Sequence, residues 1–241
     1  EIRPVLAMMQ YDPASNARAD KCWLRAGQTF GDYASECSSG ALLIWGDSHA
    51  ARLYAGLARQ GNDIAQFTRD GCPPSAAGPY QNCAESNAAI LRRIAELKPR
   101  RIILAAAWAN HERYLQPEVR DEGLMAALME LRDTVEDIIV IGQGPLWSPD
   151  MPTQVYESWR ANGKLPDRLR PMALPYRRIN EALAAMSAAA GARFVSPFDA
   201  LCNEQGCLTH TPASKAELLS WDYGHSTLAG ARYLGGLLHL D

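Results

Sequence analysis

Two short motifs near opposite ends of the 241-residue chain hold side chains that together can perform acyl chemistry. The first, Gly46-Asp47-Ser48-His49, follows an apolar run and precedes a helical pattern. A serine at such a corner lies near free N–H groups and the positive end of a helix dipole. The second motif places Asp222 three residues before His225 in a turn. These residues predict Ser48 as a nucleophile, His225 as its base and Asp222 as the residue that orients the base.

Each motif alone also has a simpler interpretation. Asp47 or Ser48 can act only as a helix cap, and Asp47 can stabilise the turn. His49 follows Ser48 directly, and consecutive helical residues point apart, so we interpret it as a packing or capping residue. The three other histidines fall in expected loops and the tail, where they are expected on the surface: His111, His210 and His239.

Composition limits the classes of partner. With 24 basic and 27 acidic residues, the formal charge of −3 gives no global attraction to nucleic acid or anionic lipid. No apolar run approaches the roughly 20 residues that cross a bilayer. The sequence begins at Glu1 without a methionine, so we expect a fragment or processed form of a longer protein with an upstream targeting or membrane portion.

Six cysteines form three couples that are local in the sequence. None has the C-x-x-C spacing with nearby histidines that a zinc site requires, so no metal is expected. The couples predict three disulfides and hence an oxidising compartment, and the alternative is six free thiols in a cytosolic enzyme. The predicted pairs are Cys22–Cys37, Cys72–Cys83 and Cys202–Cys207.

Apolar runs of strand length alternate with helical patterns, which predicts a parallel sheet of about five strands with helices on both faces. Residues 1–40 carry turn formers and no sustained period, so we interpret them as an N-terminal extension packed on a domain of residues 41–241. Ligands of such sheets bind at the carboxyl ends of the strands, where Ser48 lies. The expected strands are 41–45, 62–67, 101–107, 138–141 and 193–196, and the expected helices include 49–60 and 84–98.

The motifs also resemble a known family. Gly46-Asp47-Ser48-His49 with Asp222-x-x-His225 resembles the SGNH hydrolase superfamily of esterases, lipases and O-acetyltransferases. Residues 69–74 (Arg-Asp-Gly-Cys-Pro-Pro) and a later Ala-Ala-Trp segment extend the likeness. With them, the chain resembles the periplasmic SGNH domain fused to membrane acyltransferases that O-acetylate bacterial surface polysaccharides. The likeness covers about residues 20–240. It implies a flavodoxin-like, three-layer α/β/α sandwich.

The resemblance implies an oxyanion hole of three donors: the backbone N–H of Ser48, a glycine after the second strand and an asparagine after the third. Gly71 matches the glycine by position. The usual Gly-x-Asn segment is replaced by residues 105–110, Ala-Ala-Ala-Trp-Ala-Asn, so Asn110 is the nearest asparagine, with a turn residue as its alternative role.

Residues 143–174 form an unusually long gap that is rich in proline and aromatic residues. Segments of this kind are generally functional lids or disordered. Aromatic rings in it can stack on sugars or can pin the loop to the domain. Trp108 and Trp147 are the predicted contacts to an acceptor.

The resemblance sets the order of the functional hypotheses. The first is O-acetyl transfer, through an acyl-serine, to a bacterial surface glycan such as an O-antigen, exopolysaccharide or peptidoglycan. An upstream membrane acyltransferase domain would deliver the acetyl groups, with no bound cofactor, and the domain would be periplasmic in an inner-membrane protein. The second is a periplasmic carbohydrate acetylesterase. The third is a glycan-binding module whose triad no longer turns over.

Overall fold

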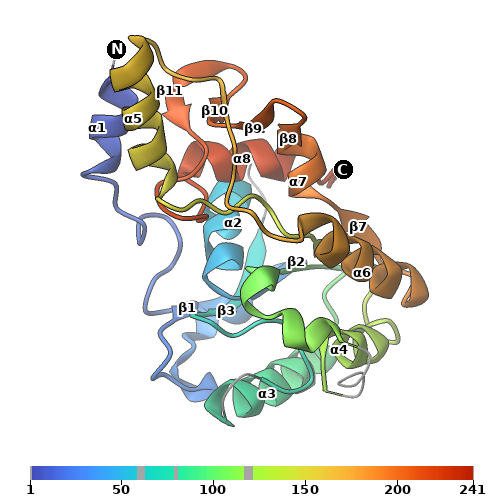
Figure 1. The fold of residues 1–241 in the computed structure, drawn as a ribbon. Helices are drawn as coiled ribbons and strands as arrows, with labels where there is room; N and C mark the ends of the chain where they lie inside the picture. The colour runs from blue at the N-terminus through green and yellow to red at the C-terminus, as the bar shows by residue number, and fades with distance from the viewer. Residues whose placement is uncertain (1, 59–62, 79–80, 117–121, 241) are drawn as a thin grey trace.

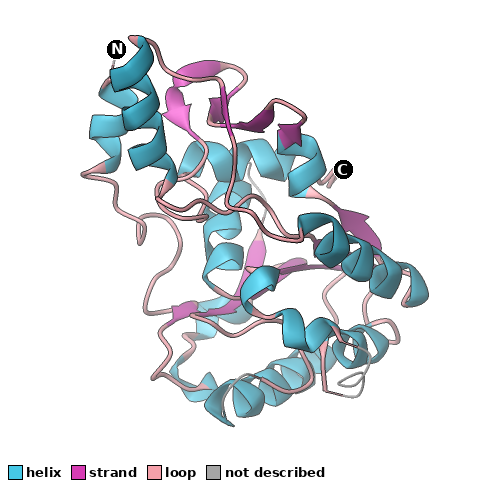
Figure 2. Ribbon diagram, in the orientation of Figure 1, coloured by secondary structure: helices cyan, strands magenta, loops and turns pink. Residues whose placement is uncertain are grey.

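A parallel six-stranded sheet forms the centre of the molecule in the computed structural model, which describes residues 2–58, 63–78, 81–116 and 122–240 (Figures 1 and 2). The strand order is β1-β3-β2-β4-β5-β7, and all pairings are parallel. The strands are β1 (Trp23–Leu24), β2 (Leu42–Gly46), β3 (Ile64–Arg69), β4 (Arg101–Ala105), β5 (Asp137–Ile141) and β7 (Arg193–Val195). The predicted fold class is therefore confirmed.

The order in which the chain adds strands reverses at β2, in the interior of this sheet. From β2 it passes to β3 on one side and then crosses back to β4 on the other. In the register of the sheet, Gly46 stands opposite Thr68 of β3 and Ala105 of β4. Open parallel sheets bind ligands at such a switch point, outside the carboxyl ends of the strands. The next residues after Gly46 are Asp47 and Ser48.

Helices cover both faces of the sheet because the strands are apolar on both sides. Leu43 and Trp45 belong to the core beneath α3 (Gln81–Leu97), α4 (Leu124–Leu131) and α6 (Tyr176–Ala189). Ile44, between them in the strand, belongs to the opposite core beneath α2 (Ser48–Ala58) and α8 (Leu228–Gly236). This alternation follows from the twofold repeat of a strand. It produces the three layers expected from the sequence.

A smaller assembly of short elements adjoins the sheet at the upper end of Figure 1. Its apolar core joins residues far apart in the chain, including Val5, Trp147, Val155 and Leu218. The elements are α1 (Arg3–Met8), α5 (Met151–Asn162), β6 (Arg168–Leu169), α7 (Pro197–Leu201), β8 (Cys202–Asn203), β9 (Gly206–Leu208), β10 (His210–Thr211) and β11 (Ser214–Leu218). Single 3₁₀ turns are η1 (Phe30–Asp32), η2 (Ser35–Ser38), η3 (Trp108–Asn110) and η4 (Glu112–Leu115).

The structure departs from the expected elements in two places. The extension supplies a sixth strand, because β1 pairs with β3. The segment expected as a long loop contains α5, which begins after Asp150, whose carboxylate accepts a hydrogen bond from Thr153 N, and ends before Gly163 in the left-handed conformation (φ 71°). Residues 59–62, at the end of the expected helix 49–60 and the start of the expected strand 62–67, lie outside the described residues.

All three predicted disulfides are confirmed: Cys22–Cys37, Cys72–Cys83 and Cys202–Cys207. Each closes a short loop, of 15, 11 and 5 residues in sequence separation. Across the described ranges, no helix is both long and apolar enough to span a bilayer.

Candidate active site

The corner between β2 and α2 is fixed by a glycine and a buried carboxylate. A Cβ at Gly46 would lie 1.8 Å from the carbonyl oxygen of Ala105, so only glycine lets β4 approach this closely. Asp47 is 2% exposed. Its Oδ1 accepts a hydrogen bond from His49 N at 2.8 Å, and its Oδ2 accepts one from Ala107 N at 2.9 Å. Asp47 thus ties the end of β4 to the first turn of α2, where Ser48 lies.

Ser48, His225 and Asp222 form one hydrogen-bonded chain across this corner. Ser48 Oγ lies 2.8 Å from His225 Nε2, and His225 Nδ1 lies 2.7 Å from Asp222 Oδ2. The other oxygen of Asp222 accepts hydrogen bonds from the backbone N–H groups of Gly224 and His225, at 2.9 and 2.8 Å. Ser48 and His225 are 177 residues apart in the sequence, and the fold brings them together. With Asp222 they have the geometry of a nucleophile, a base and a residue that orients the base.

The surroundings keep Asp222 ionised. Burial alone would raise the pKa of its carboxyl group, but the hydrogen bond and the charge of His225 and the two backbone N–H donors outweigh burial and lower that pKa below its ordinary value. A carboxylate at this position holds the Nδ1 proton of His225 and leaves Nε2 directed at Ser48. This is the arrangement that proton removal from the serine requires.

Two aromatic rings stack on the imidazole of His225. The ring of His49 stacks on it with a centroid separation of 4.2 Å, and the indole of Trp221 stacks on it at 5.7 Å. The pKa of His49 is lowered to about 4. The main cause is the loss of hydration on burial, and the second is the proximity of His225. His49 is therefore uncharged at neutral pH and packs against the base, which agrees with its expected packing role.

Residues of the N-terminal extension contact the loop that carries Asp222 and His225, partly through Arg52. The buried guanidinium of Arg52 on α2 donates to the carbonyl oxygen of Ser226 at 3.1 Å, to that of Ser15 at 3.2 Å and to the hydroxyl of Tyr11. The ring of Tyr11 stacks on Trp221 at 5.9 Å. Sequence reasoning missed these contacts because Tyr11, Ser15 and Arg52 stand in no motif.

The segments expected to supply oxyanion donors lie at the ends of β3 and β4. Gly71 follows β3 with φ 61°, and its neighbour Cys72 is held by the disulfide to Cys83. Asn110 ends η3 and is exposed. Its side chain acts to lower the pKa of Tyr223, although burial raises that pKa overall. The catalytic roles of Gly71 and Asn110 remain predictions, and Tyr223 is a neighbour that the sequence did not single out.

Both tryptophans expected to contact an acceptor are buried. Trp108 has no exposed surface, and its indole N–H donates to the carbonyl oxygen of Ile141 at 2.7 Å. Trp147 is 2% exposed and packs in the core of the smaller assembly. Apolar packing under the adjoining elements withdraws both rings from the surface, and their contact with an acceptor stays a prediction.

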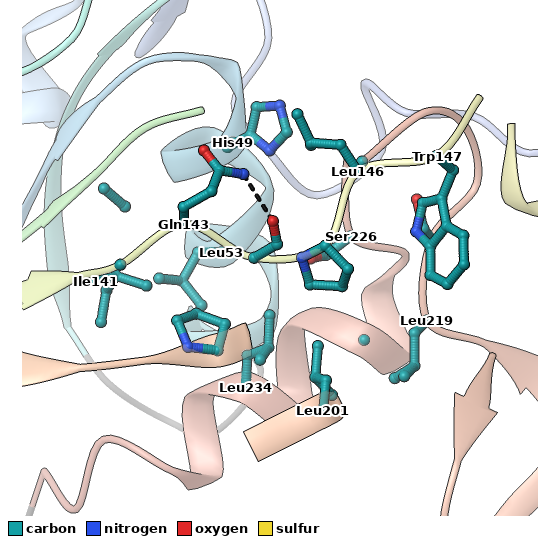
Figure 3. A pocket seen from close by; sticks show the side chains of 18 of the residues that line it. His49, Leu53, Ile141, Gln143, Leu146, Trp147, Leu201, Leu219, Ser226 and Leu234 are labelled. Atoms are coloured by element: carbon teal, nitrogen blue, oxygen red, sulfur yellow. Dashed lines mark hydrogen bonds between the residues drawn. The ribbon is translucent and has the colours of Figure 1, made fainter. Parts of the chain in front are cut away.

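A small pocket with a volume of about 80 Å³ lies beside the loop that holds Asp222 and His225 (Figure 3). His49 and Gly224 contribute to its wall, and most of the remainder is apolar, including Leu146, Trp147 and Leu219. Gln143 adds an amide whose Nε2 donates to the carbonyl oxygen of Gly144. Within the described residues, no group of three or more His, Cys, Asp or Glu side chains is placed to hold a metal ion.

A parallel α/β/α sandwich with a serine, a histidine and an aspartate joined at the carboxyl edge defines the class of SGNH-hydrolase-like folds. Within that class, residues 13–239 match the family described as "SGNH domain (fused to AT3 domains)". The chain belongs to this family.

A solved periplasmic domain has a similar fold. The periplasmic domain of a lipopolysaccharide acetyltransferase from Salmonella ser. Paratyphi A is similar with a TM-score of 0.75 and 20% identity, over 98% of this chain and 95% of that chain. A catalytic mutant of an acetylxylan esterase from Geobacillus stearothermophilus is similar with a TM-score of 0.44 and 13% identity, over 81% and 90% of the two chains. The search of curated proteins finds no significant match.

Proposed function

We propose that this chain is the periplasmic O-acetyltransferase domain of a bacterial inner-membrane protein, and that it moves acetyl groups onto hydroxyls of a cell-surface polysaccharide through an acyl-serine. The observation that carries the proposal is the hydrogen-bonded chain of Ser48, His225 and Asp222 at the switch point of the sheet. Membership of a family whose domains are fused to AT3 domains supports an upstream membrane acyltransferase as the source of acetyl groups. The three disulfides support an oxidising compartment.

In the first half of the reaction, Ser48 Oγ attacks the carbonyl carbon of the acetyl donor while His225 Nε2 takes the hydroxyl proton. Asp222 stabilises the resulting imidazolium, and the backbone N–H groups of Ser48 and Gly71 stabilise the oxyanion. The carbonyl bond re-forms, the bond to the leaving group breaks, and His225 returns its proton to that group. The product is acetyl-Ser48.

In the second half, a glycan hydroxyl gives its proton to His225 and attacks the acetyl carbonyl of the acyl-serine. Collapse of the second tetrahedral intermediate forms the sugar ester, and His225 returns the proton to Ser48 Oγ. No bound cofactor takes part. The glycan is the acceptor, and nucleic acid has no role.

The alternative is a periplasmic carbohydrate acetylesterase, in which water replaces the glycan hydroxyl in the second half. It is favoured by the exposure of Asn110 and of Tyr223, which is 37% exposed, because an open site admits water. A third possibility, an inactive glycan-binding module, predicts a site with the same residues and no turnover.

The deciding experiment follows products by mass spectrometry after incubation with a small acetyl ester, with and without oligosaccharide acceptors. It compares the wild type with Ser48→Ala and with Ser39→Ala, an exposed serine that serves as the control. Acetylated oligosaccharide from the wild type and Ser39→Ala, and none from Ser48→Ala, is the expected result. Release of acetate alone, dependent on Ser48, would favour the esterase. Turnover by Ser48→Ala equal to the wild type would overturn the serine mechanism.

A further inference from the structure

Tyr11 of the N-terminal extension contacts the catalytic loop, residues 221–228, at both of its ends. The ring of Tyr11 stacks on the indole of Trp221, with a centroid separation of 5.9 Å and an interplanar angle of 22°. Its hydroxyl oxygen accepts a hydrogen bond at 2.8 Å from the backbone N–H of Leu228, the first residue of α8. One side chain from a distant part of the sequence therefore spans the loop that carries Asp222 and His225.

Arg52 joins the same hydroxyl to the backbone of the loop. Its guanidinium is buried and donates to the hydroxyl of Tyr11 and, at 3.1 Å, to the carbonyl oxygen of Ser226. A guanidinium has only donors, and so does the backbone N–H of Leu228. The phenol oxygen of Tyr11 is therefore the acceptor in both of its hydrogen bonds, and their direction is fixed.

The contacts continue from Tyr11 to the base through Trp221. The indole of Trp221 also stacks on the imidazole of His225, with a centroid separation of 5.7 Å and an interplanar angle of 22°. The backbone N–H of Trp221 donates to the carbonyl oxygen of His225 at 3.2 Å. The imidazole must hold Nδ1 at 2.7 Å from Asp222 and Nε2 at 2.8 Å from Ser48 at the same time. A shift of the indole or of the loop backbone would disturb both of these hydrogen bonds.

Resting on the proposed acyl transfer, we infer that Tyr11 is a positioning residue for the base, and that it holds the catalytic loop so that Nε2 of His225 stays directed at Ser48. Tyr11 acts through the ring of Trp221 and the backbone of Leu228, and no covalent bond to it forms or breaks during the reaction. It precedes residues 13–239, which match the family model. A residue outside that match therefore completes the site.

The kinetic test compares Tyr11→Phe, which removes only the hydroxyl, with Tyr11→Leu, which also removes the ring. We expect kcat for hydrolysis of a small acetyl ester to fall roughly 10-fold in Tyr11→Phe and on the order of 100-fold in Tyr11→Leu, with KM within about twofold of the wild type, because a displaced base slows the chemistry. Tyr33→Phe is the matched control. It removes a hydroxyl of the same extension that donates to the carbonyl oxygen of Thr68 on β3 at 3.0 Å, and its kcat is expected to be unchanged.

Proton NMR reads the position of the base without any turnover. The proton on Nδ1 of His225 lies in the 2.7 Å hydrogen bond to Asp222, and its signal is identified by its loss from His225→Ala. If the loop opens more often without Tyr11, this proton should exchange with water on the order of 10-fold faster in Tyr11→Leu than in the wild type. Tyr33→Phe should exchange at the wild-type rate. Circular dichroism and thermal unfolding verify that each variant is folded at the temperature of the measurements.

Combining Tyr11→Leu with Asp222→Asn shows whether the tyrosine acts through the base. Once Asp222→Asn has released the imidazole, Tyr11→Leu should lower kcat by less than about threefold more. A Tyr11→Leu variant with wild-type kcat, a change confined to KM, a loss of the same size in both backgrounds or an unchanged exchange rate would overturn the inference. Ser48→Ala is measured in parallel. Ester hydrolysis that survives in it refutes the acyl-serine, whereas the exchange rate still decides the role of Tyr11.

Discussion

Replacing Asp47 with asparagine tests how the nucleophile corner is held. The Asp47 side chain is 3% exposed, and its two oxygens accept from the backbone N–H groups of His49 and Ala107. Its Oδ2 also lies 3.5 Å from His111 Nε2. An asparagine has one acceptor oxygen, so its NH₂ group must face one of these N–H donors. Asp47→Asn therefore leaves a buried backbone donor without an acceptor.

The magnitude follows from that lost acceptor. A hydrogen bond to a charged group contributes about 1.5–3 kcal/mol, and an unpaired buried donor costs about 1–3 kcal/mol. Because these figures describe overlapping parts of the same loss, we expect Asp47→Asn to lower the free energy of unfolding by about 2–3 kcal/mol. For a chain of this length, the midpoint of thermal unfolding is expected to fall by roughly 4–12 °C.

Urea denaturation, monitored by circular dichroism, measures this change. The dependence of the free energy of unfolding on urea concentration, m, must be the same for the two proteins. Asp133→Asn is the control, because Asp133 is 77% exposed and, among the residues that the structure describes, forms an ion pair with the adjacent, half-exposed Arg132 at the surface. We expect its free energy of unfolding to stay within about 0.5 kcal/mol of the wild type. An Asp47→Asn variant as stable as this control would refute the bracing role of Asp47.

The pH dependence of the same variant gives an independent check. Burial would raise the pKa of Asp47, but the hydrogen bond and charge of His111, the charge of His49 and the N–H of Ala107 outweigh it and lower that pKa. A folded pKa below the unfolded value of about 4 means that the stabilisation is complete above pH 4 and is lost as the pH falls through the folded pKa. The difference between wild type and Asp47→Asn should therefore shrink in acid. A difference that grows below pH 4 would contradict this sign.

Three further changes probe other parts of the account. Asp222→Asn should lower kcat for ester hydrolysis on the order of 10²–10⁴-fold, because an amide does not fix the tautomer of the base; unchanged kcat would refute its orienting role. Replacing Cys72 and Cys83 with alanine should lower the free energy of unfolding by about 3 kcal/mol, from the entropy of an 11-residue separation, and urea curves unchanged from wild type would contradict that estimate. Gly56→Ala should lower the free energy of unfolding by about 2 kcal/mol or more, because its Cβ would lie 2.3 Å from the backbone of α8. In the control Gly236→Ala the new Cβ meets nothing within 4 Å, so the free energy of unfolding should rise by at most about 1 kcal/mol. Similar melting temperatures for the two variants would refute the close packing of α2 on α8.

The parts of the fold that were predictable are those encoded locally. Continuous apolar runs mark β4 and β5 because both faces of those strands are covered. Cysteines close in sequence formed the expected disulfides. Ser48 and the Asp222–His225 turn were recognisable because each lies in a short motif whose residue types suit one chemistry.

The rest depended on contacts between distant segments. Trp108 follows a strand at the expected edge of the site, but its indole turns into the core to reach the carbonyl of Ile141, and no local pattern distinguishes these outcomes. The helix α5 was hidden by the prolines around it, although Asp150 and Gly163 are a recognisable cap at each end. The contact of the Tyr223 hydroxyl with His49 arises only when two segments that are distant in the sequence meet.

The central claim is that Ser48 is an activated nucleophile, and covalent labelling tests it most directly. The protein is incubated with a serine-reactive phosphonate, and intact-protein and peptide mass spectrometry locate the adduct, with Ser48→Ala and Ser39→Ala in parallel. We predict one adduct, on Ser48, that is absent from Ser48→Ala and present in Ser39→Ala. A folded wild-type protein that stays unlabelled, or one that is labelled at another residue, would contradict the account.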